Sequence, residues 1–327
     1  MKVTILTPTY NRGYTLKKLY NSLINQTNKN FIWLVIDDGS TDDTRNLINL
    51  FMKEEKIKIE YHYQKNGGKH RALNYGISLI KSEITFIVDS DDWITDDAIE
   101  TILKYFRKYK DDENIGVISF LKAYPDFKIN GPQYSKDEYR GNYIEDRLNK
   151  NNWGDKAEVC YTNVLKKYPL PEIEKEKFIS EGYLWVKMAL DYDTIYINKV
   201  IYIADYLQDG LTNNIYKMRI KNPKGCIEVA KMACNDKANL KIKYKNMIKY
   251  IAYSLIDKRK FYEIYRNINY KFIFITSFIP GILFKKYIIK KNGKSNINQY
   301  YIKCFATNFY NYIWIYNTKN YNRLFWL

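Results

Sequence analysis

Three carboxylates stand within four positions in the stretch Val88-Asp89-Ser90-Asp91-Asp92-Trp93. Like charges this close repel and raise each other's pKa, so a fold tolerates them where a cation or a substrate neutralises them. Asp89 and Asp91 are two positions apart and can turn to one face at the end of a strand. Their oxygens suit Mg²⁺ or Mn²⁺, which proteins hold with one or two carboxylates plus substrate phosphates. The alternative is a loop whose aspartates cap the helix predicted near residues 96–109.

The residues around this stretch alternate between predicted strands and predicted helices. Strands are predicted over residues 3–7, 31–36, 57–63 and 84–87, and helices over residues 16–24, 47–51 and 69–81. Such alternation predicts an open α/β sheet, mostly parallel and flanked by helices, with right-handed crossovers.

A polar cluster follows each of the four predicted strands. The clusters are Pro8–Arg12, Asp37–Ser40, Asn66–Lys69 and Asp89–Asp92. Ligands of open α/β sheets bind beyond the carboxyl ends of the strands, so we expect the four clusters to form one site. The first strand–helix turn lacks the GxGxxG fingerprint, and no GxxxxGK[ST] loop occurs, which argues against a dehydrogenase and a P-loop kinase.

Four motifs, taken together and in this order, resemble those of a known enzyme family. They are Thr-Pro-Thr-Tyr-Asn-Arg (7–12), Asp-Asp-Gly-Ser-Thr-Asp (37–42), Gly-Gly-Lys-His-Arg-Ala-Leu-Asn (67–74) and Asp-Ser-Asp-Asp (89–92). This series is similar to the signatures of the inverting family-two glycosyltransferases with the GT-A fold. The resemblance covers roughly residues 1–214 and is strongest before Trp93. Residues 154–159 and 206–211 resemble enzymes of capsule and cell-surface polysaccharide synthesis.

The resemblance implies a nucleotide-sugar donor, most often a UDP-sugar. The loop that wraps the base and ribose corresponds to Pro8, Thr9, Tyr10 and Arg12. A tyrosine ring can stack on a base and an arginine can pair with phosphate, although Tyr10 could instead pack in the core.

Two further positions complete the implied donor site. Asp38 corresponds to the acceptor of the base N–H, with Asp37 as the alternative contact or as a helix cap only. Lys69 corresponds to a cation near the base or pyrophosphate. His70 and Arg71 are alternatives, because anions favour that helix N-terminus, and a solvated basic cluster is the other interpretation.

The same resemblance assigns the acidic loop. By this resemblance Asp89 meets the ribose or the metal, and Asp91 binds the metal that bridges the diphosphate. Ser90 belongs to the donor site. Asp92 is a candidate to support these residues without binding the metal itself. The implied cofactor is Mn²⁺ or Mg²⁺. A divalent cation would stabilise the charge that develops on the leaving nucleotide diphosphate.

An inverting transferase needs a general base that deprotonates the acceptor hydroxyl. The candidates are Glu174, Glu176, Glu181, Asp191 and Asp193. We favour Glu181, because it precedes an apolar helix start where the family's Glu-Asp pair usually lies; the pair reads Glu-Gly here, which departs from the family pattern. A helix-capping carboxylate is the alternative.

Trp153 and Asp155 are candidates for the acceptor site. A buried structural tryptophan is the alternative for Trp153.

The charge of the chain is unevenly distributed. The 327 residues carry a net charge of +17, yet residues 215–327 hold 23 Lys and Arg against 4 Asp and Glu, whereas residues 1–214 hold 30 against 32. We therefore predict a nearly neutral GT-A domain over residues 1–214 and a basic, mainly helical domain over residues 215–327. With 46% hydrophobic residues, the chain is globular rather than disordered.

The four cysteines are widely spaced and form no CxxC pair, which fits a reducing compartment. The N-terminal apolar run is too short for a signal peptide, so we expect a cytosolic location.

The basic region contains an apolar run, Phe272–Phe284, that is expected to break at Pro280-Gly281. At thirteen residues it is shorter than the roughly 20 residues that span a bilayer. It is either a buried core helix or an interfacial segment, and the lysines that follow it favour an anionic membrane surface. A nucleic-acid surface is the rival interpretation, which we disfavour because no RNA-binding motif occurs.

The sequence thus predicts a metal-dependent inverting transferase of surface polysaccharide assembly, peripheral at the cytoplasmic face of a bacterial membrane, with a glycan or lipid-linked sugar as acceptor. A sugar nucleotidyltransferase and a non-catalytic glycan-binding homologue are the alternatives. The first would need a Gly-rich basic loop, which residues 7–13 do not supply, and the intact pair Asp89 and Asp91 argues against the second.

Overall fold

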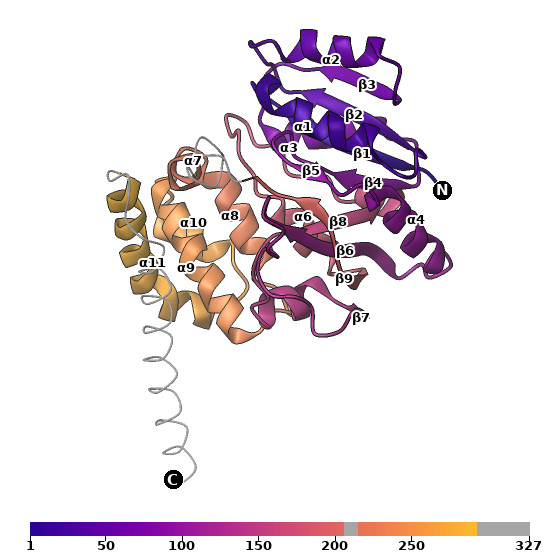
Figure 1. The fold of residues 1–327 in the computed structure, drawn as a ribbon. Coiled ribbons are helices and arrows are strands. Elements are labelled where there is room, and N and C mark those ends of the chain that lie inside the picture. Colours follow the sequence, from indigo (N-terminus) through magenta and orange to yellow (C-terminus); the bar gives the residue numbers. More distant parts are fainter. Residues whose placement is uncertain (206–214, 293–327) are drawn as a thin grey trace, which may run out of the picture.

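A computed structural model describes residues 1–205 and 215–292 of the chain. Within these residues a sheet of nine strands, flanked by helices, is followed by a group of helices (Figure 1). The strands are β1 (Val3–Thr9), β2 (Phe31–Asp37), β3 (Ile59–Tyr63), β4 (Ile84–Ile87), β5 (Trp93–Ile94), β6 (Ile115–Ala123), β7 (Glu138–Gly141), β8 (Lys156–Tyr161) and β9 (Asp193–Ile203).

The helices comprise six that accompany the sheet, five that follow it and one short π-helical segment. The first six are α1 (Gly13–Ile24), α2 (Thr44–Lys53), α3 (Lys69–Leu79), α4 (Ala98–Lys108), α5 (Thr162–Leu165) and α6 (Gly182–Met188). The five that follow, within the described residues, are α7 (Ile215–Lys221), α8 (Pro223–Met232), α9 (Leu240–Ile256), α10 (Phe261–Arg266) and α11 (Lys271–Asn292). The π-helical segment is η1 (Tyr143–Asn149).

The strand order is β3-β2-β1-β4-β8-β6-β9-β5, and β7 pairs with β9 outside this path. The first four strands of this order pair in parallel, as the alternation of strands and helices predicts. Beyond β4 the sheet is mixed, because β8 is antiparallel to both of its neighbours. The predicted α/β sheet is confirmed, and the carboxyl ends of β1, β2, β3 and β4 lie along one edge.

Helices cover both faces of the parallel half of the sheet. Ile5 and Trp33 belong to a buried cluster with side chains of α1 and α2, whereas Leu6 and Leu34 pack with side chains of α3 on the other face. Because side chains alternate between faces along a strand, this double cover leaves little room for polar groups within the strands. Polar side chains are therefore concentrated where the strands end.

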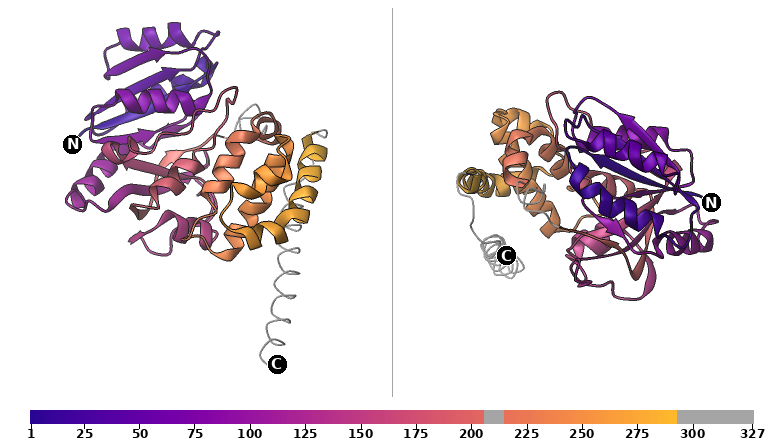
Figure 2. Two further views of the ribbon diagram at one scale, coloured as in Figure 1. Left: turned by 180° about the vertical axis from the view of Figure 1, so that it is seen from behind. Right: turned by 45° about the horizontal axis from the view of Figure 1, so that its top comes forward.

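Helices α7 to α11 have a hydrophobic core of their own beside the sheet (Figures 1 and 2). The described part does not include residues 206–214, which precede these helices. It also does not include residues 293–327, to which Lys294 and Cys304 belong. The capsule-like segment over residues 206–211 is therefore also outside it. The division into domains of residues 1–214 and 215–327 stays a prediction.

The predicted break at Pro280-Gly281 is wrong. Helix α11 continues through both residues, and Gly281 sits so close to α9 that a Cβ atom there would lie 2.5 Å from Cγ2 of Ile251. Tertiary packing against α9 thus outweighs the local preference of proline to end a helix. The helix formed is longer than the apolar run and, by length and composition alone, is long and apolar enough to cross a membrane. The most apolar 18-residue window within residues 271–291 has a mean hydropathy of 1.6, and 28% of that window is buried.

Candidate active site

A cleft of about 610 Å³ lies at the carboxyl edge of the parallel strands. Each of the four predicted polar clusters contributes to its lining, so the four clusters lie together in one cleft. The predicted residues that line it are Pro8, Thr9, Tyr10, Arg12, Asp38, Lys69, Asp89, Ser90, Asp91, Asp92 and Asp155. Glu181 and Trp153 are not among the lining residues.

The loop after β1 is held by the loop after β2. Asn11 has a positive φ of 51° and accepts a hydrogen bond from the Thr41 N–H on its side-chain oxygen at 2.8 Å. Its own N–H donates to Oγ of Ser40 at 2.9 Å. Tyr10 is 48% exposed, which excludes core packing and leaves its ring free to contact a ligand in the cleft.

Asp38 organises the loop between β3 and α3. Its carboxylate accepts hydrogen bonds from the backbone N–H groups of Gly67 at 2.8 Å and Gly68 at 2.7 Å. It also accepts from the side-chain amides of Gln64 and Asn66. Asp37 faces elsewhere, since its oxygens accept from the Ser40 N–H and from the Tyr61 hydroxyl and it does not line the cleft. Asp38 is therefore the residue of this pair that reaches the site.

The start of α3 is packed against the segment before α6. Gly68 has φ of 96°, and a Cβ atom there would lie 2.1 Å from the carbonyl oxygen of Lys177. Arg71 donates to the carbonyl oxygens of Gly67, Ile173 and Glu176, each at 2.7 Å. His70 is 1% exposed and does not line the cleft. Of the three basic candidates at this helix start, Lys69 alone faces the cleft.

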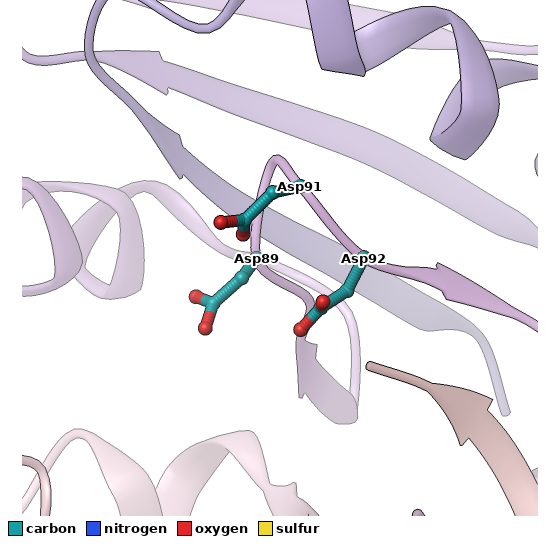
Figure 3. Close-up of side chains that lie close together, drawn as sticks. All are labelled: Asp89, Asp91 and Asp92. Atoms are coloured by element: carbon teal, nitrogen blue, oxygen red, sulfur yellow. The ribbon is translucent and has the colours of Figure 1, made fainter. Parts of the chain in front are cut away.

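The acidic loop after β4 carries three carboxylates whose oxygens lie within 4.8 Å of one another (Figure 3). The side chains of Asp89 and Asp91 point to the same side of the loop in Figure 3. The Tyr202 hydroxyl supports both ends of this loop: it accepts from the Asp89 N–H at 3.1 Å and donates to Asp92 at 2.6 Å. The other oxygen of Asp92 accepts from the Asp205 N–H at 2.8 Å, so Asp92 braces the loop.

The electrostatics of the loop reflect burial and crowding. Burial, and then the charge of Asp89, raise the pKa of Asp91. Burial, with the charges of Asp89 and Asp91, raises the pKa of Asp92 to about 7. Burial opposes ionisation of Asp89 too, but the charges of Lys69 and Lys122 outweigh it and lower the pKa of Asp89. Hard carboxylate oxygens this close fit a divalent cation.

Lys69 joins the acidic loop to the favoured base. Its Nζ atom lies 2.6 Å from Oδ1 of Asp89 and 2.6 Å from Oε1 of Glu181. Burial disfavours the ammonium, but the two carboxylates outweigh it, and the pKa of Lys69 is raised. Glu181 occupies the N-cap position of α6 but makes no capping hydrogen bond, which counts against the helix-cap interpretation. Through Lys69 it stands next to the cleft.

The other candidate bases either have hydrogen-bond or ion-pair partners outside the cleft or are exposed to solvent. Glu176 is buried and accepts from the Gly225 N–H, Asp191 accepts from the Tyr168 hydroxyl, and Asp193 pairs with Arg140. The Glu174 side chain is 87% exposed. None of the four lines the cleft.

Asp155 lines the cleft, whereas Trp153 does not. Trp153 is 57% exposed, so the buried-tryptophan interpretation is wrong.

Several residues of the cleft are absent from the sequence-based prediction. Lys122 at the end of β6 lines it, with Nζ 3.7 Å from the centroid of the Tyr202 ring, and Lys177 lines it while donating to Asn66. These residues lie in the second half of the sheet and in a loop, outside any of the four motifs. No strand or helix was predicted around Lys122, so the sequence analysis held no signal that marked it as a cleft residue.

Residues 4–168 match the model of the family described as glycosyl transferase family 2. The match spans just over half of the chain and includes the four strand-end clusters. The chain belongs to glycosyl transferase family 2. The predicted family is thereby confirmed.

Three curated relatives of this family member come from bacteria. Glycosyltransferase GlyA of Streptococcus pneumoniae is 32% identical over 215 residues, which make up 62% of this chain and 30% of GlyA. The chain likewise spans only 38% of glycosyltransferase GlyG from the same organism, with 33% identity. The GalNAc(5)-diNAcBac-PP-undecaprenol beta-1,3-glucosyltransferase of Campylobacter jejuni is 24% identical over 87% of this chain and 96% of that enzyme.

Two solved structures share the fold. TarS of S. aureus in complex with UDP-GlcNAc superposes with a TM-score of 0.60 at 17% identity, covering 86% of this chain and 81% of TarS. The mannosyltransferase PcManGT of Pyrobaculum calidifontis in complex with GDP-Man and Mn²⁺ gives 0.55 at 17% identity, covering 89% and 86%. The family member thus has the predicted GT-A fold, with a helical region after the sheet.

Proposed function

We propose that this family member transfers a sugar from a nucleotide-sugar donor, a UDP-sugar in the first instance, to an acceptor hydroxyl. The observation that carries the proposal is the convergence of the β1 loop, Asp38, Lys69 and the acidic loop in one cleft. Nucleotide sugars occupy two proteins of the same fold, TarS with UDP-GlcNAc and PcManGT with GDP-Man.

Pro8, Thr9, Tyr10 and Arg12 then surround the base and ribose, together with Ser90 of the acidic loop. Asp38 faces the base from the opposite loop. A carboxylate offers about four lone-pair positions, and those of Asp38 already accept four hydrogen bonds. A base N–H would therefore replace one of these donors, and the side-chain amide of Gln64 can give way more readily than the backbone.

Asp89 and Asp91 would hold Mn²⁺ or Mg²⁺. One carboxylate oxygen of Asp89 and one of Asp91 lie within 4.8 Å of each other. The ion pair with Lys69 is made by Oδ1 of Asp89. A divalent cation there would supply positive charge to the leaving nucleotide diphosphate. Lys122 lines the same cleft and adds a cation from the protein itself. The residues present therefore fit the metal.

Glu181 would take the proton of the acceptor hydroxyl as that oxygen attacks the anomeric carbon from the side opposite the diphosphate. Oε1 of Glu181 is bound to Lys69, and Oε2 has no partner among the described residues. Oε2 is thus available to accept the proton. A single displacement of this kind inverts the configuration at the anomeric carbon.

For the acceptor we propose a glycan or a lipid-linked sugar in surface polysaccharide assembly, with Asp155 and the exposed ring of Trp153 on the acceptor side. The Campylobacter relative carries PP-undecaprenol in its name. The family member would work at the cytoplasmic face of the membrane. Helix α11 supports this location with an exposed apolar stripe formed by Phe272, Ile275, Ile279 and Leu283, followed by Lys285 and Lys286.

A turnover screen tests this function. The full chain is incubated with a panel of UDP- and GDP-sugars and Mn²⁺, and the released nucleotide diphosphate is measured with and without lipid-linked acceptors. We expect one donor to be consumed. The anomeric configuration of the product, measured by NMR, should be opposite to that of the donor. Absence of turnover with every donor, together with absence of nucleotide binding, would support the non-catalytic alternative.

A further inference from the structure

A second cavity, of about 60 Å³, lies between the segment before α6 and helices α7, α8 and α9. Its lining comprises Phe178, Ser180, Arg219, Cys226, Val229, Ala230, Asn246, Lys249 and Tyr253. Phe178 also lines the large cleft, so the two cavities share a wall. Ser180 directly precedes the proposed base Glu181, which places the second cavity next to the acceptor side of the site.

The lining of this cavity is positively charged and rich in hydrogen-bond donors. Arg219 and Lys249 contribute two cations, and among the described residues no carboxylate lines it. Lys249 makes no ion pair or hydrogen bond within the described part of the chain, and Arg219 contacts the buried Tyr253 hydroxyl. Asn246 is 8% exposed and commits one N–H to the Ile242 carbonyl oxygen, which leaves its second N–H for a ligand.

The positive charge here is not balanced by the neighbouring groups. Burial, and then the charges of Lys245 and Arg219, lower the pKa of Lys249 to about 7. A buried cation without a counter-charge is costly, so an anion that enters this cavity gains from the two cations and the converging donors. A phosphate group matches this set, because its oxygens accept several charge-assisted hydrogen bonds and suit the fork of an arginine.

We propose that the cavity between Ser180, Arg219, Asn246 and Lys249 binds a phosphate group. The role of this site rests on the proposed function: a phosphate carried by the acceptor would set the acceptor hydroxyl beside Glu181. Two sources offer the same chemistry: a phosphate carried by the acceptor itself, such as the diphosphate of a lipid-linked sugar, or the headgroup of an anionic lipid.

Calorimetric titration of the full chain with inorganic phosphate tests the site. The variant is Lys249→Met, and the matched control is Lys241→Met, which removes the same charge from an exposed position on the same helix, two turns away. We expect wild type and Lys241→Met to bind phosphate alike, and Lys249→Met to bind it about tenfold or more weakly. Arg219→Gln should weaken binding similarly, as a second variant independent of Lys249.

Equal phosphate affinity in wild type, Lys249→Met and Arg219→Gln would overturn the assignment, as would a wild-type chain that binds no phosphate. Flotation with phosphatidic acid vesicles separates the sources. Vesicle binding that is lost in Lys249→Met but kept in Lys241→Met identifies a lipid headgroup. Vesicle binding that is equal in both, with phosphate binding lost only in Lys249→Met, identifies a phosphate of the acceptor.

These titrations contain neither donor nor metal, so they are independent of the transferase reaction. A chain that binds phosphate through Lys249 but consumes no nucleotide sugar loses the proposed function and keeps the anion site. A chain that transfers sugar but binds phosphate equally with and without Lys249 keeps the function and loses the site.

Discussion

At the scale of single residues, the least expected feature is Lys69. The resemblance to the family places this lysine near the donor base or pyrophosphate, and it does line the cleft. Its two ion pairs with Asp89 and Glu181 could not be predicted, because Glu181 comes from a loop far along the chain whose path no local pattern specifies. Lys69 thus connects the proposed metal site to the proposed base.

Replacing Glu181 with Gln keeps the shape of the side chain and removes the base. We expect kcat to fall by about 10² to 10⁴-fold while donor affinity stays near that of wild type, since general-base catalysis acts on the chemical step. Steady-state kinetics with calorimetric donor binding measures both quantities. Glu174→Gln is the matched control, because its side chain is 87% exposed and outside the cleft. Near-normal turnover in Glu181→Gln would move the base to another group.

His70 should make stability depend on pH. Its ring is 1% exposed, neither nitrogen has a hydrogen-bond partner among the described residues, and burial, then the charge of Arg71, lower its pKa to about 4. Between pH 6.5 and 4 the unfolded chain binds a proton at this histidine and the folded chain does not. The free energy of unfolding should therefore fall as pH falls through this range, by about 3 kcal/mol in total.

Denaturant unfolding at pH 7 and at pH 4.5 checks this prediction. His70→Leu removes the titrating group and its unsatisfied nitrogens, so it should flatten this part of the pH dependence. His62→Leu, at the half-buried second histidine, should retain the full slope. An unchanged slope in His70→Leu would show that other groups cause the acid sensitivity.

At the scale of elements, strands and helices of the parallel half follow directly from the periodicity of apolar residues. Each strand predicted there forms, because burial on both faces selects continuous β-branched and apolar runs. Helix α11 shows the limit of such local rules. Pro280 predicts a helix end, yet packing of Gly281 against Ile251 of α9 holds the helix continuous, and this contact is not visible in the sequence around it.

The turn that begins α3 should tolerate no side chain at position 68. Gly68 combines a φ of 96° with a Cβ position 2.1 Å from the Lys177 carbonyl oxygen. Gly68→Ala should lower the free energy of unfolding by about 2 to 4 kcal/mol, from backbone strain and overpacking. Gly182→Ala is the control, since the nearest atom to its Cβ is Oγ of Ser180 at 3.5 Å. Equal stability of the two variants would contradict the close approach at Gly68.

At the scale of the whole molecule, the positive charge is concentrated in the C-terminal part of the chain. Residues 215–327 carry a net charge of +19 and residues 1–214 a net charge of −2. Each lysine or arginine near an anionic leaflet contributes about 1 kcal/mol of attraction, and the nearly neutral part contributes little. The same region holds the exposed apolar stripe of α11. Both terms act in one region, which favours membrane docking through it.

Vesicle co-sedimentation of the full chain tests this docking. Replacing Ile275 and Ile279 with Asp should weaken binding to anionic vesicles by at least about tenfold, because two exposed apolar side chains no longer enter the interface. Replacing the exposed Leu50 and Met52 of α2 with Asp is the matched control and should leave binding unchanged. High salt should weaken wild-type binding, as the Debye length falls from about 10 Å at 0.1 M to about 3 Å at 1 M. Equal binding by both double variants would exclude α11 as the contact.

Much of the candidate site was predictable from the sequence, and the reason lies in the topology. Parallel strands bring their carboxyl ends to one edge, so the motifs after β1, β2, β3 and β4 had to meet there. Lys122 and Tyr202 were not predictable. Their strands, β6 and β9, are separated from the parallel strands of the sheet by β8, which runs antiparallel to β4 and β6. Where strands and helices do not alternate regularly, no sequence rule says which end of a strand lies beside Asp89.

The most direct test of the proposed metal-dependent donor site is a calorimetric titration of the full chain with UDP and UDP-sugars, with and without Mn²⁺. Asp91→Asn removes a charge from the acidic loop at constant volume, and Asp111→Asn makes the same change at an exposed turn. We expect Mn²⁺ to strengthen nucleotide binding in wild type and in Asp111→Asn, and this gain to fall at least about tenfold in Asp91→Asn with an unchanged Tm. Nucleotide binding that is indifferent to Mn²⁺, or equal in all three proteins, would contradict the site.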